Sequence, residues 1–140
     1  MAEPISDLVS HLFYDGELRV ADDALSDGAW RSARSIQFAE FGPEQHLALP
    51  EVAENGIWSQ TYRGPIRYGS ADRIAEMIKE ALDRGQVQPK QVIVLTPFRA
   101  QRSLLRQRLG AHGVRQVKVS TVHRAQGSEA PVVLDRKSVV

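Results

Sequence analysis

An almost continuous apolar run, Gln-Val-Ile-Val-Leu-Thr at residues 91–96, constrains the fold of this chain more than any other feature. Such a run is typical of a strand with both faces buried, as in a parallel sheet covered by helices. Stretches with helical periodicity stand on either side of it, and Pro97 ends it. We therefore expect βαβ units and a parallel sheet around residues 91–96.

Two amphipathic helices are expected to flank this strand. The first is predicted to begin at Ser70, a good N-cap residue, and to end before Gly85, which suits the position after a helix. Its apolar face comprises Ile74, Ala75, Ile78, Ala81 and Leu82. The second spans residues 98–109, with Leu104, Leu105 and Leu109 facing inward. Further strands are predicted at residues 117–121 and 131–134.

The N-terminal half is less regular. Pro4 suits the first turn of a helix, and apolar residues recur after it at helical spacing up to Phe13. The turn Asp15-Gly16 is expected to end this helix. Between residues 29 and 67 we expect a loop-rich segment with two short strands, at residues 35–38 and 56–62.

Charge is divided unevenly along the 140 residues. Residues 1–60 carry eleven acidic and three basic side chains, a net charge of −8, whereas residues 61–140 carry six acidic and fifteen basic ones, a net charge of +9. The segment from Arg84 to Ser128 holds nine Lys and Arg and no acid. This asymmetry indicates either an anionic partner for the C-terminal half or pairing of the two halves within one fold. Arg102, Arg106 and Arg108 are expected on a solvated helix face, where they contribute mostly to the electrostatic field of the protein.

Several function classes are disfavoured. The chain has no cysteine, which excludes a disulfide framework, a thiolate metal site and a cysteine nucleophile. Its four histidines lack paired ligand spacing, so no metal site is predicted. No run is long and apolar enough to span a membrane, and the first residues lack the features of a secretory signal. A soluble, cytoplasmic protein is therefore expected.

Two polar segments stand where predicted strands end, at residues 96–101 and 120–129. In parallel sheets, ligands gather at this carboxyl edge. Arg99 stands at the opening of a helix, where it could donate to a phosphate, or it is simply a solvated arginine. Gly127 permits close approach of a ligand. Glu129 either accepts a hydrogen bond from a sugar hydroxyl of a ligand, or pairs with a nearby arginine within a short loop that joins two strands.

The same two segments carry a family resemblance. Thr-Pro-Phe-Arg-Ala-Gln at residues 96–101, followed by Ser-Thr-Val-His-Arg-Ala-Gln-Gly-Ser-Glu at residues 120–129, resembles motifs IV and V of superfamily 1 helicases. Met-Ala-Glu-Pro-Ile at the start, with Phe-Tyr-Asp-Gly-Glu-Leu at residues 13–18, is similar to the entry of the second motor domain in the subgroup that includes the nonsense-mediated-decay RNA helicase. The resemblance spans residues 1–135, although residues 25–65 match no motif.

This resemblance implies an α/β, RecA-like three-layer fold with a mostly parallel sheet, like a P-loop NTPase but without the P-loop. It implies one motor domain over residues 1–135, followed by a tail at residues 136–140 that fits neither the family nor a strand. It also implies an enzyme that binds ATP and Mg²⁺ between two RecA-like domains and moves along single-stranded DNA or RNA.

Carried over position by position, the resemblance assigns two sets of residues. Those implied to bind nucleic acid are Thr96, Pro97, Ser120, Thr121 and His123. Those implied to bind ATP are Gly127, Glu129, Arg99 and Gln101, with Glu129 on the ribose, although subgroups differ in what the turn of motif IV contacts.

The departures from the family pattern are equally informative. The sequence holds no Gly-x-x-x-x-Gly-Lys-Ser/Thr, no Asp-Glu pair after an apolar strand and no final Asn-Val-Ala-x-Thr/Ser-Arg-Ala motif. We therefore expect a fragment cut at both ends that has no catalytic residues of its own. Its N-terminal motor domain would be a partner, and its exposed interdomain face would favour self-association. The alternatives are a stand-alone basic nucleic-acid-binding module and an unrelated basic α/β domain.

Overall fold

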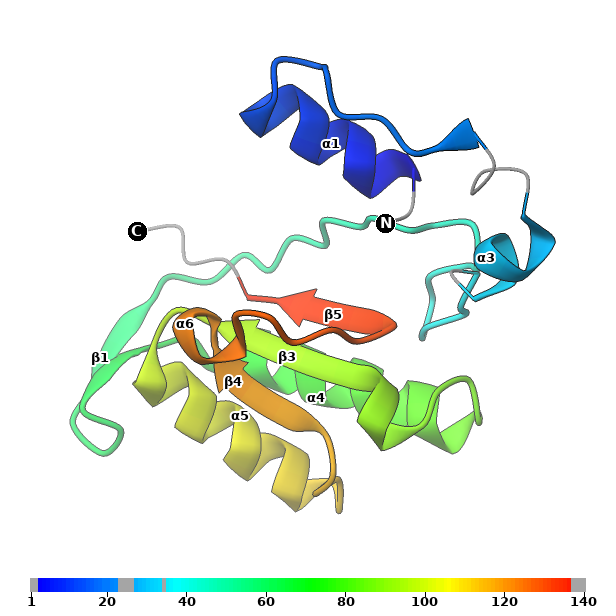
Figure 1. Ribbon diagram of the computed structural model, residues 1–140. Helices are drawn as coiled ribbons and strands as arrows, with labels where there is room; N and C mark the ends of the chain where they lie inside the picture. Colours follow the sequence, from blue (N-terminus) through cyan, green and yellow to red (C-terminus); the bar gives the residue numbers. More distant parts are fainter. Residues whose placement is uncertain (1–2, 23–26, 34, 137–140) are drawn as a thin grey trace. The chain divides into compact units, whose positions relative to one another are not determined.

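The computed structural model describes residues 3–22, 27–33 and 35–136 (Figure 1). Its contacts divide the chain into two compact units, Met1–Pro50 and Glu51–Val140. Of the predicted tail, only Arg136 lies within the described residues, and its N–H donates to the carbonyl of Leu95 at 2.9 Å.

The C-terminal unit contains a three-stranded parallel sheet in the order β4-β3-β5 (Figure 1). Its central strand is β3 (Val92–Thr96), and its neighbours are β4 (Lys118–Thr121) and β5 (Val132–Asp135). The short helix η1 (Pro89–Gln91) leads into β3, and α6 (Val122–Ala125) follows β4. The predicted α/β class and parallel sheet are confirmed, and the arrangement is consistent with a RecA-like fold.

Two helices form the core with this sheet. These are α4 (Tyr68–Asp83) and α5 (Arg99–Ala111), which pack on each other, while α5 also contacts β3 and β4. Most of the predicted apolar faces are buried, with Ile78, Leu104 and Leu105 at 0% exposure, whereas Ile74 and Leu82 of α4 are half-buried. Helix α5 continues through Gly110 to Ala111, two residues past the predicted end, and it is Gly113 that takes the left-handed conformation, with φ at +75°.

The start of α4 differs from the prediction. The N-cap is Arg67, and Ser70 is a buried residue of the first turn. The two carboxylate oxygens of Glu54 accept from the backbone N–H groups of Gly69 (2.9 Å) and Ser70 (3.0 Å). A carboxylate from a distant loop thus replaces the local cap, and the assignment of Ser70 as N-cap is wrong. Gly85 ends the helix as predicted, with φ at +67°.

A β-hairpin precedes α4. Strand β1 (Ile57–Ser59) pairs antiparallel with β2 (Gly64–Ile66), so the strand predicted over residues 56–62 is shorter and turns back. Pro65 hid β2 from the sequence analysis, because proline is confined to edge strands and bulges. A Cβ on Gly64 would lie 2.9 Å from the Cβ of Ala100 in α5, so only glycine allows this approach.

The N-terminal unit contains few regular elements. Helix α1 (Glu3–Phe13) confirms the predicted helix, but Leu12 and Phe13 are 62% and 75% exposed. Helix α3 (Gly28–Ser32) is capped by Asp27, whose side chain accepts from the N–H of Ala29 at 2.9 Å. In place of the strand predicted at residues 35–38 there is a single bridge between Phe38 and Phe41.

Candidate functional site

The carboxyl edge of the sheet brings together the two predicted segments. In the register of the parallel strands, Leu95 pairs with Ser120 and Thr96 with Thr121. Both segments therefore leave the sheet side by side, as the parallel arrangement predicts. Strand β5 ends at the same edge, where Leu95 pairs with Asp135.

The residues predicted to bind nucleic acid lie at this edge in two settings. Pro97 and His123 are exposed, the first after β3 and the second on α6. Thr96, Ser120 and Thr121 are buried, with exposed fractions of 0%, 7% and 7%. The hydroxyl of Thr96 has no hydrogen-bond partner among the described residues. An unpaired buried hydroxyl is costly, so it marks a place where a ligand or a water would be stabilised.

A cavity of about 480 Å³ opens at the same edge. Its walls come from the start of β1, the end of β2, the turn between β3 and α5, and Arg136 after β5. The residues that line it are Asn55, Gly56, Ile57, Trp58, Pro65, Ile66, Arg67, Thr96, Pro97, Phe98, Gln101 and Arg136. Sequence reasoning found only the wall at residues 96–101, because the hairpin and Arg136 reach the cavity through tertiary packing.

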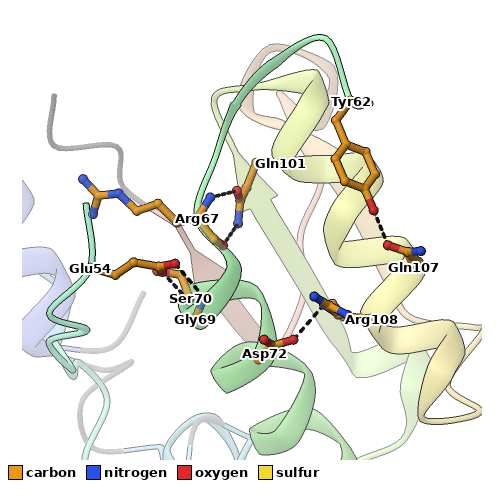
Figure 2. A network of polar contacts seen from close by, with 9 residues as sticks. All are labelled: Glu54, Tyr62, Arg67, Gly69, Ser70, Asp72, Gln101, Gln107 and Arg108. Carbon is orange, nitrogen blue, oxygen red and sulfur yellow. Dashed lines mark hydrogen bonds and ion pairs between the residues drawn. The ribbon is translucent and has the colours of Figure 1, made fainter. Parts of the chain in front are cut away.

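Gln101 binds the backbone of Arg67 with both ends of its amide. Its Oε1 accepts from the N–H of Arg67 at 2.8 Å, and its Nε2 donates to the carbonyl of Arg67 at 3.1 Å (Figure 2). The side chain is 3% exposed. Gln101 therefore fixes the junction between β2 and α4, and its predicted role with ATP would require these bonds to be exchanged.

Two arginines lie close together at the cavity. Burial and the nearby Arg67 guanidinium lower the pKa of Arg136, and the carboxylate of Glu54 opposes this shift. The same carboxylate caps α4, because both of its oxygens accept from backbone N–H groups of that helix.

A second group of arginines covers α5 and α6. Burial, followed by the charges of Arg106, Arg124 and Arg99, lowers the pKa of Arg102. Arg106 also donates to the carbonyl of Val119 at 3.1 Å. The four arginines form a positively charged patch, which we name the α5–α6 arginine patch.

Arg108 does not belong to this patch. Its guanidinium pairs with Asp72 at 2.8 Å and lies 5.5 Å from the centre of the Tyr68 ring, so it links α5 to α4 (Figure 2). The expectation that Arg108 is merely solvated is wrong, because Asp72 on the preceding helix lies within reach.

The predicted ATP residues are distributed over two places. Gly127 and Glu129 share the loop between α6 and β5, and both are exposed. Gly127 has φ at +78°, and a Cβ built there meets no atom within 4 Å, so the backbone is open to a ligand. Glu129 makes no ion pair with any residue that the structure describes. Arg99 is exposed at the first turn of α5. These three are accessible, whereas both ends of the Gln101 amide bond to the backbone of Arg67.

Neither a membrane-spanning helix nor a metal-binding cluster occurs in the described part of the chain. No helix there is long and apolar enough to cross a membrane. No group of three or more His, Cys, Asp or Glu side chains with the arrangement of a metal site occurs among those residues.

The three-stranded parallel sheet with polar segments at its carboxyl edge belongs to an α/β domain and is consistent with a RecA-like fold. A family model described as an AAA domain matches residues 1–136. The chain belongs to this family, and it is a helicase-type domain. Domains of this type generally use ATP and Mg²⁺. No curated protein matches the chain.

Proposed function

We propose that this chain is the second motor domain of an ATP-dependent superfamily 1 helicase, and that its carboxyl edge binds single-stranded nucleic acid. The register of β3 and β4 supports this proposal best, because it places Thr96 opposite Thr121 and aligns the two motifs at one edge. The similarity of the N-terminal segment favours the subgroup that includes the nonsense-mediated-decay RNA helicase.

In this proposal the exposed residues of the edge contact the nucleic acid directly. His123 donates to a phosphate or a sugar, and Pro97 lies against the backbone. Thr96 offers a hydroxyl that no described residue uses. Ser120 and Thr121 are buried at the end of β4, so they shape the edge.

The nucleotide part of the proposal concerns the loop after α6. ATP, when bound, supplies the free energy of hydrolysis that drives movement along the strand. Glu129 would accept from the ribose hydroxyls, and Gly127 would let the backbone approach the nucleotide. Arg99 is accessible to a phosphate. The Mg²⁺ ligands and the phosphate-binding loop would come from a partner RecA-like domain.

Binding of a fluorescein-labelled oligonucleotide of twelve thymidines or uridines to the full chain tests the proposal. Affinity should fall as the salt concentration rises, because phosphate contacts release counterions. His123→Ala should weaken binding about threefold to tenfold, because a typical hydrogen bond contributes about 1 kcal/mol. His112→Ala is the matched control, since His112 is exposed beyond the other end of α5. No binding at low salt, or equal losses in the two variants, would contradict the proposal.

The α5–α6 arginine patch favours a second candidate, a stand-alone nucleic-acid-binding module. The guanidinium groups of Arg99, Arg106 and Arg124 lie near that of Arg102, and such a cluster attracts a polyanion without any need for ATP. This candidate predicts that Arg102→Gln with Arg106→Gln removes most of the affinity while His123→Ala leaves it unchanged. The motor-domain proposal predicts that His123→Ala weakens oligonucleotide binding even when all four arginines of the patch are present.

A further inference from the structure

The cavity at the carboxyl edge has one wall that the two motifs do not explain, the β1–β2 hairpin. This wall presents Ile57 and Trp58, which are 50% and 67% exposed. An indole exposed to this degree contributes little to folding, because most of its apolar area stays in water. Its place on the wall of a cavity is therefore better explained by a ligand than by packing.

The hairpin that carries Trp58 is firmly attached to α5. Gly64 approaches Ala100 closely, Gln101 holds the backbone of Arg67, and the hydroxyl of Tyr62 bonds with Gln107 (Figure 2). These contacts fix the hairpin at both its turn and its end. The wall is thus formed before any ligand arrives, which lowers the entropy lost on binding.

The polar side of the cavity is built for an anion. Arg67 and Arg136 line it and lie near enough to repel each other, with the carboxylate of Glu54 as the neighbouring negative charge. Thr96 adds a fully buried hydroxyl without a partner among the described residues. Arginines bind phosphate through planar, charge-assisted hydrogen bonds, and a hydroxyl can donate to the same group.

An aromatic platform beside a phosphate-binding pair is the arrangement that binds one unit of a single strand. We infer that this cavity binds one nucleotide of the strand, with the base stacked on Trp58 and the phosphate held by Arg67, Arg136 and Thr96. The inference rests on the proposed function and extends it, because Thr96 and Pro97 belong both to the cavity and to the edge. The strand would therefore continue from the motif segments across the hairpin.

The chain has two tryptophans, Trp30 and Trp58, which allows a direct test. In the Trp30→Phe variant, Trp58 is the sole indole. Oligothymidine of twelve units should quench its emission saturably, in step with the anisotropy of a labelled oligomer. An abasic oligomer of the same length has the phosphates without bases, so it should bind more weakly and leave the emission unchanged.

Substitution of Trp58 provides the second readout. Trp58→Leu should weaken oligothymidine binding about tenfold, as expected for one lost base–aromatic stack, and should leave abasic binding unchanged. Trp58→Phe should restore most of the affinity, which separates stacking from folding. Tyr14→Leu is the control, because Tyr14 is an aromatic residue of the other unit with 54% exposure.

The two arginines are tested through the salt dependence. The double variant Arg67→Gln, Arg136→Gln should reduce the slope of log K against log salt by roughly 0.7, since the pair holds one phosphate and each phosphate contact of a single strand contributes about 0.7. Oligothymidine that binds without any change in Trp58 emission would overturn this inference and leave the proposed function standing. A chain that binds no oligomer at low salt would overturn both.

Discussion

Helices α1 and α4 have the same pattern of apolar residues, but their apolar faces are buried to different degrees. In α4 the residues Ala75, Ile78 and Ala81 are fully buried, whereas in α1 Leu12 and Phe13 are mostly exposed. The difference arises because α5 packs along α4, while no described element of the N-terminal unit covers Leu12 and Phe13. A periodic pattern therefore predicts a helix and its apolar face, but the partner that covers the face is decided by tertiary structure.

The largest expected effect contrasts the two helices directly. Ile78→Ala should lower the free energy of unfolding by about 3 kcal/mol, because it leaves a cavity in a closed core. Leu12→Ala should change it by less than about 0.5 kcal/mol, since the side chain is already in water. Urea denaturation of both variants measures the contrast. Equal losses would show that the apolar face of α1 is covered in solution.

A smaller effect is expected at the junction between β2 and α4. Gln101→Leu keeps the shape of the side chain but leaves the N–H and carbonyl of Arg67 without their partner, at a cost of about 2 kcal/mol. Gln107→Leu lies on the same helix and removes only the exposed bond with Tyr62, so it should cost about 0.5 kcal/mol. A difference in urea midpoints between these variants supports the structural role of Gln101, and identical midpoints argue against it.

The cap of α4 should contribute about 1 kcal/mol. Glu54→Ala removes the carboxylate that accepts from Gly69 and Ser70 and interacts favourably with the helix dipole. Glu51→Ala, an exposed acidic residue of the same segment, is the comparison and should be nearly neutral. If thermal unfolding gives the same midpoint for both, the cap at Glu54 is not formed in solution.

The smallest expected effect concerns the ion pair between Asp72 and Arg108. Both side chains are partly exposed, at 45% and 35%, so Asp72→Asn should cost only about 0.5 kcal/mol. The difference between this variant and the parent should shrink further in 1 M NaCl, because the pair is screened. A loss above about 2 kcal/mol would mean that the pair is desolvated.

Much of the fold could be predicted because its signals are local. The buried run of β3, the faces of α4 and α5 and the strands β4 and β5 follow from periodicity within short windows. The contacts that were missed join distant residues. Glu54 reaches α4 across 15 residues, and Gln101 reaches Arg67 across 34. Local sequence patterns do not predict hydrogen bonds between residues so far apart in the sequence.

The candidate site also has a part that the sequence predicted and a part that it did not. Motif order predicted that residues 96–101 and 120–129 meet at one edge, and the register of β3 and β4 confirms this. The hairpin wall with Trp58 and the contribution of Arg136 were not predicted, because the walls of the cavity come from four separate stretches of the chain. The binding roles of the individual residues stay predictions.

One measurement tests the central proposal most directly, a titration of the ¹⁵N-labelled chain with oligothymidine followed by amide chemical shifts. The account predicts that the largest changes fall on residues 96–101 and 120–129, at the carboxyl edge of the sheet. Changes confined to residues 112–116, near the opposite edge, or to α1 in the N-terminal unit would contradict it.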